Sequence, residues 1–444
     1  QDTITRFLPD YPLQGASITI EHLLTHTSGI RDFTSIKDSV QRYKQDVSPA
    51  QMIAYFRQQP LRFAPGSRYE YSNSNYFLLG AIIEAISGQS YEEYLRSHFF
   101  LPLAMTNTSL DKEGQLVPNR ASGYTKGANG FENAGFISMT QPYAAGAILS
   151  TVEDLHRWHL ALHSNKLVRK ETLAKALLPY RLSNGKESNY GYGFRFGFIQ
   201  QSPSVWHGGL ISGFKSTALF LPKEDVYVVV LANCDGSSPE ISTAQLAALA
   251  IGKSYLDQPI AVLPEVLKSY PGVYENAAGE LRVINVDKGR LYTQVGRAKK
   301  VYATPVRKHE FFLEDPMITL QFSVGSDNSV KGFSIFTRNG SESWTRTDKE
   351  APSETAVKVN EQLLALYAGT YEVSPQFSFV VSQESGRLFL QAGGQEKLEL
   401  FAESNSKFFL KVNDAQLEFI VEGGKVTKAL LKQGGRSTDA LKVR

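Results

Sequence analysis

The second half of the chain contains an internal repeat that restricts how this region can fold. Four short segments recur 97 residues further along: "YPGVYE" at 270–275 as "YAGTYE" at 367–372, "GRLY" at 289–292 as "GRLF" at 386–389, "EFFL" at 310–313 as "KFFL" at 407–410, and "LQF" at 320–322 as "LEF" at 417–419. Four matches in one register indicate a tandem duplication. Within each copy, short strand-like runs alternate with Gly, Asn and Asp turns, which is typical of a sandwich or barrel. Two copies are too few for a solenoid, so we expect two separate closed β-modules.

The repeat and the region before it divide the chain into three predicted domains. Residues 1–257 mix helical and strand patterns, and "STALFLPKEDVYVVVLAN" at 216–233 is typical of an antiparallel hairpin. We therefore predict an α/β or α+β domain at 1–257, one β-module at 258–350 and a second at 360–444, with a polar linker between the modules. A chain of 444 residues is long enough for two to three domains.

Composition and charge argue against several classes of function. The formal net charge is +3 without long Lys/Arg runs, which argues against a nucleic-acid or anionic-membrane partner. No stretch approaches about 18 uninterrupted apolar residues, so we expect no transmembrane segment. The single cysteine, Cys234, excludes an internal disulfide and a cysteine-based zinc site. His156, His159 and His163 share one face of a predicted helix, but three ligands on one straight helix cannot surround an ion, so we predict no metal and no cofactor.

A polar segment, Tyr71-Ser72-Asn73, stands directly before a predicted amphipathic helix in "RYEYSNSNYFLLGAIIEAISG" at 68–88. A phenol beside a cation could take a proton from a serine hydroxyl, and Asn73 could hydrogen-bond a substrate amide. Alternatively, Tyr71 packs under the helix, and Asn73 or Ser74 is its N-cap. The segment alone leaves both interpretations open.

A second candidate is "SVWHGGLISGFKS" at 204–216, where three glycines surround His207 just before the predicted hairpin. A glycine-rich strand edge lets a ligand approach backbone N–H groups. A turn-rich connection with a buried histidine explains the same residues, and the stretch alone does not decide between the two. His26, in "LLTHTSG" at 23–29, is expected in the turn that ends a helix.

Together these stretches resemble the serine β-lactamase-like, penicillin-recognising hydrolases, a group of class C β-lactamases, DD-peptidases, D-aminopeptidases and related esterases. Tyr71-Ser72-Asn73 fits the family's Y-x-N motif, and His207-Gly208-Gly209 fits its third motif, K-T-G in β-lactamases and H-x-G in D-aminopeptidases. The matching stretches cover nearly all of residues 1–255 in family order: "ITIEHLLTHTSGI" at 18–30, "FAPGSRYEYSNSNYFLLGAIIEAISG" at 63–88, "LPLAMTNTSL" at 101–110, "AAGAILSTVEDL" at 144–155 and "HGGLISGF" at 207–214.

The resemblance implies a fold and an activity. The fold is a β-lactamase-like domain, with an antiparallel sheet flanked by helices, followed by two tandem lipocalin-like barrels of eight strands. The activity is that of a serine hydrolase acting through an acyl-enzyme on D-amino-acid peptides, amides or small esters, with β-lactams as slow acylating ligands. The alternative is a non-catalytic protein that binds peptides or peptidoglycan. The resemblance also leads us to expect a bacterial protein of the periplasm or the extracellular space.

Four residues receive roles from the resemblance, and Gly209 is counted with them as the last residue of the third motif. Tyr71 is expected to move a proton on and off a serine, and Asn73 to orient the acyl-side amide of the substrate. His207 replaces the usual lysine beside the leaving group or the substrate carboxylate. The backbone N–H of Leu210, directly after Gly209, is expected to hold the tetrahedral oxyanion together with the N–H of the serine.

The family's first motif, S-x-x-K, carries the nucleophile and its lysine, and the family places it ahead of the stretch that begins here at residue 18. No such motif stands there, and the four S-x-x-K sequences of the chain are Ser109/Lys112, Ser183/Lys186, Ser212/Lys215 and Ser404/Lys407. Three explanations compete: the segment exists in the protein upstream of this sequence, the chain is a processed or engineered fragment, or the protein is a pseudoenzyme. We expect the first, because losing a core helix would remove apolar contacts from every element packed on it.

Overall fold

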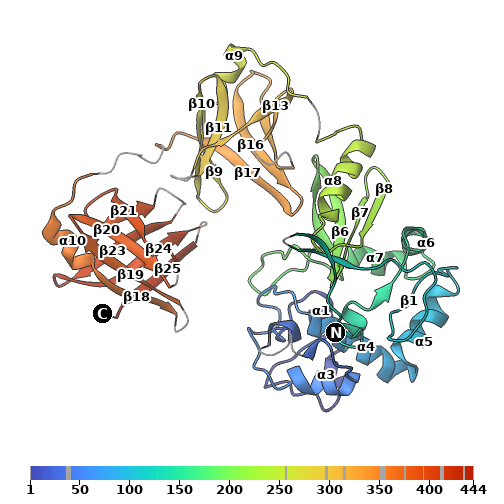
Figure 1. Cartoon of the computed structure of the whole chain (residues 1–444). Helices are drawn as coiled ribbons and strands as arrows, with labels where there is room; N and C mark the ends of the chain where they lie inside the picture. Colours follow the sequence, from blue (N-terminus) through green and yellow to red (C-terminus); the bar gives the residue numbers. More distant parts are fainter. Residues whose placement is uncertain are drawn as a thin grey trace. The chain divides into compact units, whose positions relative to one another are not determined.

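The computed structural model describes residues 2–36, 42–127, 129–255, 258–295, 299–313, 317–350, 357–374, 377–393, 395–410, 415–433 and 436–443 (Figure 1). The chain falls into two compact units. Unit 1 comprises Gln1–Tyr255 with Thr337–Gly340, and unit 2 comprises Leu256–Phe336 with Ser341–Arg444. The predicted boundary at 257 and much of the predicted linker lie outside the described residues, so the domain limits stay predictions. Among the described residues, no helix is long and apolar enough to cross a membrane.

Unit 1 contains a four-stranded antiparallel sheet in the order β5-β6-β7-β8, formed by Arg195–Ile199, Ser202–Ile211, Phe214–Leu221 and Val226–Ala232. Strands β7 and β8 are the predicted hairpin. Helix α8 (Pro239–Ala250) packs on these two strands, and α6 (Val152–His163) packs on β8. Ala244, Ala247 and Ala248 of α8 are fully buried, and their small side chains let the helix approach the sheet closely.

The remaining strands of unit 1 are short, and helix α4 is the longest of its remaining helices. Two small antiparallel ladders pair β1 (Ser109–Leu110) with β4 (Ile148–Leu149) and β2 (Tyr124–Gly127) with β3 (Gly130–Asn133). The other helical segments are η1 (Ile4–Arg6), α1 (Ile20–Leu24), η2 (Phe33–Ser35), α3 (Pro49–Phe56), α4 (Asn73–Ser87), α5 (Tyr91–Leu95), the π-helical turn η3 (Arg96–Phe100), η4 (Tyr143–Ala145) and α7 (Lys170–Ala176).

Helix α4 is the amphipathic helix predicted after the Tyr71 segment. Phe77, Leu78 and Ile82 are buried in one apolar cluster with residues of α1 and α3. The predicted apolar face continues to Ile86, but Ile86 is 63% exposed because the last turn extends beyond this cluster. Gly88 ends the helix at φ +69°, a left-handed conformation that glycine adopts without strain.

The N-terminus of α4 differs from the capping alternative. Its N-cap is Ser72, and the Ser72 side chain makes no capping hydrogen bond. Asn73 and Ser74, the two expected caps, are the first helical residues. Their side chains bond instead to the loop that follows α1.

Unit 2 contains the tandem β-modules that the repeat predicts. The second copy is a closed eight-stranded barrel, formed by β18 (Gly369–Ser374), β19 (Phe377–Glu384), β20 (Arg387–Ala392), β21 (Leu398–Ala402), β22 (Lys407–Leu410), β23 (Gln416–Glu422), β24 (Lys425–Gln433) and β25 (Arg436–Lys442), with α10 (Glu361–Tyr367) before it. In both copies a tyrosine hydroxyl donates to the carbonyl four residues earlier, Tyr274 to Tyr270 at 2.6 Å and Tyr371 to Tyr367 at 2.7 Å. These equivalent bonds support the duplication.

The first copy is a nearly closed sheet in the order β12-β11-β10-β9-β17-β16-β15-β14-β13. Its elements are α9 (Pro264–Leu267), β9 (Gly272–Asn276), β10 (Leu281–Asp287), β11 (Arg290–Val295), β12 (Val301–Tyr302), β13 (Thr304–Arg307), β14 (Glu310–Phe312), β15 (Thr319–Val324), β16 (Val330–Thr337) and β17 (Gly340–Thr347). Only Ala303 separates β12 from β13, and β12 pairs with β11 whereas β13 pairs with β14. In the second copy one strand, β21, pairs with both neighbours. The first copy is therefore the same barrel with one strand broken at Ala303.

Candidate active site

The first turn of α4 is fastened to the loop that follows α1. The Asn73 amide donates to the Asp32 carboxylate at 3.0 Å, and the Ser28 hydroxyl donates to the Asn75 side-chain oxygen at 2.6 Å. The Ser74 hydroxyl bonds two backbone groups of the same loop. These contacts use the polar side chains directly after Tyr71 and fix where Tyr71 lies.

Tyr71 faces three basic side chains. Its ring centroid lies 4.1 Å from the imidazole of His26 and 6.2 Å from that of His207, and the guanidinium carbon of Arg195 lies 5.5 Å from it. Burial raises the pKa of Tyr71, Arg195 opposes this shift, and Asp32 adds to it. Among the described residues, the nearby cation therefore does not suffice to favour the phenolate.

A chain of hydrogen bonds connects the Tyr71 segment to β6. The Ser72 N–H donates to His26 Nδ1 at 3.2 Å, and His26 Nε2 lies 3.3 Å from the Tyr190 hydroxyl. The same hydroxyl lies 2.9 Å from His207 Nε2, and His207 Nδ1 lies 2.7 Å from the Gly208 carbonyl. We call Ser72, His26, Tyr190, His207 and Gly208 the relay.

Both histidines of the relay are neutral near pH 7. Burial lowers the pKa of His26 to about 3, and the positive charges of His207 and Arg195 add to the shift. Burial and Arg195 also lower the pKa of His207. The pKa of Tyr190 is raised by burial and by its neighbouring tyrosines, so Tyr190 remains a phenol.

Arg195 is the guanidinium that lies beside Tyr71. Its guanidinium carbon lies 5.5 Å from the ring centroids of Tyr71 and Tyr190 and 5.7 Å from that of Trp206. Within the described parts of the chain, no carboxylate forms an ion pair with Arg195. Cation–π contacts stabilise a guanidinium without neutralising its charge. Arg195 therefore remains able to bind an anionic group.

The third motif lies on a strand with one open edge. Strand β5 pairs with β6 only as far as Trp206, so residues 207–211 pair on one side, with β7. The two-residue turn after Ile211 closes on a hydrogen-bonded pair, and hydrogen-bonded pairs alternate along an antiparallel ladder. The N–H and C=O groups of Gly208 and Leu210 therefore point away from β7, toward the open edge.

Gly209 and Leu210 are both exposed at this edge. A Cβ at Gly209 would lie 2.7 Å from the Ser216 hydroxyl, so glycine keeps the strand free of side-chain crowding here. The Leu210 side chain is 67% exposed, so this residue contributes its backbone rather than core packing. The structure brings Tyr71 and His207 together, and Asn73 lies two residues beyond Tyr71 on the first turn of α4.

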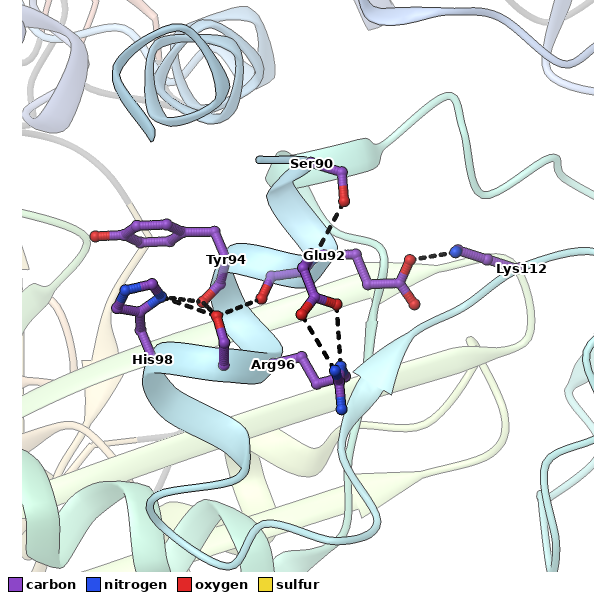
Figure 2. A network of polar contacts seen from close by, with 8 residues as sticks. Ser90, Glu92, Tyr94, Arg96, His98 and Lys112 are labelled. Carbon is purple, nitrogen blue, oxygen red and sulfur yellow. Dashed lines mark hydrogen bonds and ion pairs between the residues drawn. The ribbon is translucent and has the colours of Figure 1, made fainter. Parts of the chain in front are cut away.

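The four S-x-x-K sequences lie elsewhere and in other conformations. Lys112 pairs with the Glu92 carboxylate in a network on α5 that also joins Arg96 to Glu93 and His98 to the Tyr94 carbonyl, as Figure 2 shows. Lys112 thus serves a surface ion pair.

The other three sequences also lack a serine and lysine on one helix. Ser212 donates to the Gly135 carbonyl at 2.6 Å, and Lys215 donates to the Ser237 carbonyl at 2.9 Å. Ser183 is exposed in a turn, and Ser404 belongs to unit 2. In the described residues, no S-x-x-K pair shares a helix.

The histidine stripe of α6 packs against aromatic rings. His159 stacks on Tyr227 at 4.0 Å, and His163 lies 4.6 Å from Phe220. In the described residues, no group of three His, Cys, Asp or Glu side chains could hold a metal ion.

The sequence predicted His26 only in the turn that ends a helix, where it lies directly after α1, and it did not point to Tyr190 or Arg195. His26 adopts φ +54°, a left-handed conformation that histidine tolerates better than branched residues do. Tyr190 and Arg195 flank "GYGF", a glycine-rich segment that leads into β5. This segment ends 13 residues before His207, and its composition is the signal that could have drawn attention to it.

The chain is similar to several known proteins. Penicillin-binding protein 4* of Bacillus subtilis (strain 168) is 26% identical over 382 residues, which cover 78% of this chain and 82% of that protein. The D-aminopeptidase of Gluconobacter oxydans (strain 621H) is 27% identical over 263 residues, which cover 57% of this chain and 49% of that protein. The chain thus spans about half the length of this aminopeptidase.

Among solved structures, an octameric penicillin-binding protein homologue from Pyrococcus abyssi matches with a TM-score of 0.49 and 22% identity, over 97% of this chain and 82% of that one. A family model described as a domain of unknown function matches residues 353–441, which include most of the second β-module. The model of the beta-lactamase family matches residues 1–252, more than half of the 444 residues. The chain belongs to the beta-lactamase family.

Proposed function

We propose that the protein is a serine hydrolase that cleaves peptides or amides of D-amino acids through an acyl-enzyme. The observation that carries this proposal is the convergence of Tyr71, Arg195 and the open edge of β6 in one region of unit 1. The relatives named penicillin-binding protein and D-aminopeptidase support the same substrate class. Small esters are the next candidates.

In this proposal, the nucleophilic serine and its lysine come from chain outside the 444 residues. The serine oxygen bonds to the substrate carbonyl carbon, the C–N bond breaks, and water then hydrolyses the ester. The lysine would lie near Tyr71 and add the positive charge that Arg195 alone does not supply, which lowers the pKa of the phenol. Tyr71 then moves the proton between the serine and the leaving amine.

The open edge of β6 would bind the substrate backbone. The Leu210 N–H, directed to that edge, would donate to the developing oxyanion, as predicted from the family motif. Because Asp32 accepts from the Asn73 amide nitrogen, the Asn73 side-chain oxygen is the atom that would accept from the acyl-side N–H of the substrate. Gly209 would leave room for the substrate between these two contacts.

Arg195 would be the cation that binds a carboxylate of the substrate. His207 is neutral, and both of its ring nitrogens face protein groups, so its contribution would come through the position of β6. A guanidinium forms two parallel hydrogen bonds with a carboxylate, which favours peptides with a free C-terminus over their amides. A substrate derived from peptidoglycan would place the protein outside the cytoplasmic membrane.

The test uses the native protein, an acylating fluorophosphonate probe and intact-mass measurement. A mass above that calculated for the 444 residues, with the probe on a serine of the additional segment, is the expected result. D-Alanyl anilides should then be hydrolysed faster than their L-isomers. Binding of D-peptides without any covalent labelling would contradict the hydrolase and support the alternative of a non-catalytic peptide binder.

A further inference from the structure

The relay has two ends at which a backbone group fixes the position of a proton. At His26, the Ser72 N–H can only donate, so Nδ1 accepts and carries no hydrogen. The neutral ring therefore carries its hydrogen on Nε2, which faces the Tyr190 hydroxyl. The Asn75 amide, 3.3 Å from the same Nδ1, is a second donor consistent with this tautomer.

The other end gives the opposite tautomer. The Gly208 carbonyl can only accept, so His207 Nδ1 carries the hydrogen. The neutral ring then has a bare Nε2, which accepts from Tyr190 at 2.9 Å. The two assignments are independent, since each rests on a different backbone group.

The two ends meet consistently at one hydroxyl. In this assignment Tyr190 accepts from His26 and donates its single hydrogen to His207 Nε2 at 2.9 Å, rather than to the neighbouring Tyr76 hydroxyl, which itself donates to the Leu24 carbonyl. Tyr190 is 1% exposed, and no water is needed to complete the bonds. A phenylalanine here would leave two buried ring nitrogens without partners, and each unsatisfied buried group has a substantial cost.

The relay joins three parts of unit 1 that are distant in sequence. Ser72 precedes α4 and holds the Tyr71 segment, Tyr190 precedes β5, and Gly208 lies on the open edge of β6. His207 occupies the Gly208 carbonyl, and the first N–H group directed to the open edge after that carbonyl is that of Leu210. The hydroxyl of Tyr190 thus sets the distance between Tyr71 and this edge.

We propose that Tyr190 is a positioning residue, which holds His26 and His207 in opposite neutral tautomers and thereby fixes the edge of β6 relative to Tyr71. The consequence for catalysis rests on the proposed hydrolase function. The assignment of the tautomers does not depend on that function, so an experiment can refute the assignment and the function separately.

The first measurement is the tautomer of each histidine in the full chain at pH 7. Long-range ¹H–¹⁵N spectra of protein labelled with ¹⁵N-histidine distinguish the two neutral tautomers and the cation, and the chain has only 8 histidines. His26→Asn and His207→Gln assign the two signals. We expect hydrogen on Nε2 of His26 and on Nδ1 of His207. The same tautomer in both, or a cationic His207 at pH 7, would overturn the proposal.

The second measurement compares Tyr190→Phe with Tyr192→Phe in the native protein. The Tyr192 hydroxyl donates to the Glu21 carboxylate outside the relay, so this variant loses a hydrogen bond of similar kind two residues away. In Tyr190→Phe, we expect the His207 pKa to rise, because the neutral ring loses a donor. We also expect kcat to fall about 10²-fold with KM nearly unchanged, as for a misplaced reacting group. An equal fall in the two variants would refute a positioning role, whereas opposite tautomers without hydrolysis would refute the proposed function alone.

Discussion

His26 provides a direct test of the electrostatics of the relay. Its imidazole is 1% exposed and faces Arg195, His207 and four tyrosines, namely Tyr69, Tyr71, Tyr76 and Tyr190. Replacing it by asparagine removes the titrating group, and asparagine tolerates the φ of +54° found at this position. We predict that His26→Asn makes the stability of unit 1 less dependent on pH.

The magnitude follows from the pKa of about 3 in the folded protein against 6.5 in the unfolded chain. Between these values the unfolded state binds the proton and the folded state does not, so stability falls as pH falls. For these two pKa values, His26 alone lowers the free energy of unfolding by about 2.7 kcal/mol between pH 7.5 and pH 4.5. Other titrating groups are common to both proteins and cancel in the comparison. The variant should be less stable at pH 7.5 but should lose about 2.7 kcal/mol less on acidification.

The assay is urea unfolding of the full chain at both pH values, followed by tryptophan fluorescence. Of the three tryptophans, Trp158 and Trp206 belong to unit 1, and Trp344→Phe in both proteins silences unit 2. A local probe is needed because a chain of several domains need not unfold in one step. If the wild type and His26→Asn lose the same stability within about 1 kcal/mol, His26 is not a buried neutral imidazole and the reasoning is wrong.

Three further substitutions test the site and the fold. In the native protein, Tyr71→Phe should lower kcat by about 10²–10⁴-fold if the phenol moves the proton, and a change within a few-fold would refute this role. Arg195→Gln should raise KM about 10–100-fold for a peptide with a free carboxylate but not for its amide, and equal effects would exclude a carboxylate contact. Gly29→Ala should destabilise unit 1 by about 3 kcal/mol or more in urea unfolding, since φ is +77° and the new Cβ would lie 2.2 Å from the Phe63 carbonyl oxygen. Gly15→Ala, at φ +79° in open space, isolates the backbone strain, and an equal loss there would exclude the clash.

The sequence predicts those parts of the structure that depend on residues close together in the chain. The repeat predicts both β-modules because strand alternation and turns survive in each copy, down to the equivalent bonds of Tyr274 and Tyr371. Tyr71 and His207 were identified as candidates because each stands in a short polar or glycine-rich motif. Their proximity, however, came from the family resemblance and not from either motif.

The relay could not be predicted because its contacts connect distant residues. His26 and Tyr190 are 164 residues apart in the sequence, and neither stands in a pattern that indicates the other. The orientation of His26 also depends on a left-handed backbone conformation that the sequence does not specify. The sequence around Arg195 does not distinguish it from any other arginine of an amphipathic strand until the three aromatic rings beside it are known.

The sequence does contain a reason for the broken strand of the first β-module. Pro305 stands just after the break at Ala303, and proline cannot donate a hydrogen bond to a neighbouring strand. The register of β13 against β14 also shifts directly after Pro305. The residue of the second copy that is equivalent to Pro305 is Ala402, which pairs normally within β21.

The break at Ala303 makes the two copies unequal in cooperativity. A cavity of about 250 Å³ lies at this place, lined by Leu291, Ala303, Thr304, Pro305 and Phe311 among others. The barrel of the second copy opens only when a whole ladder between two strands separates, whereas the first copy can open at one residue while β12 and β13 keep their own partners. Local opening of this kind requires less free energy than global unfolding. Amide protons near the break should therefore exchange with solvent after a small local opening, and those of β21 should exchange only after a much larger opening of the barrel.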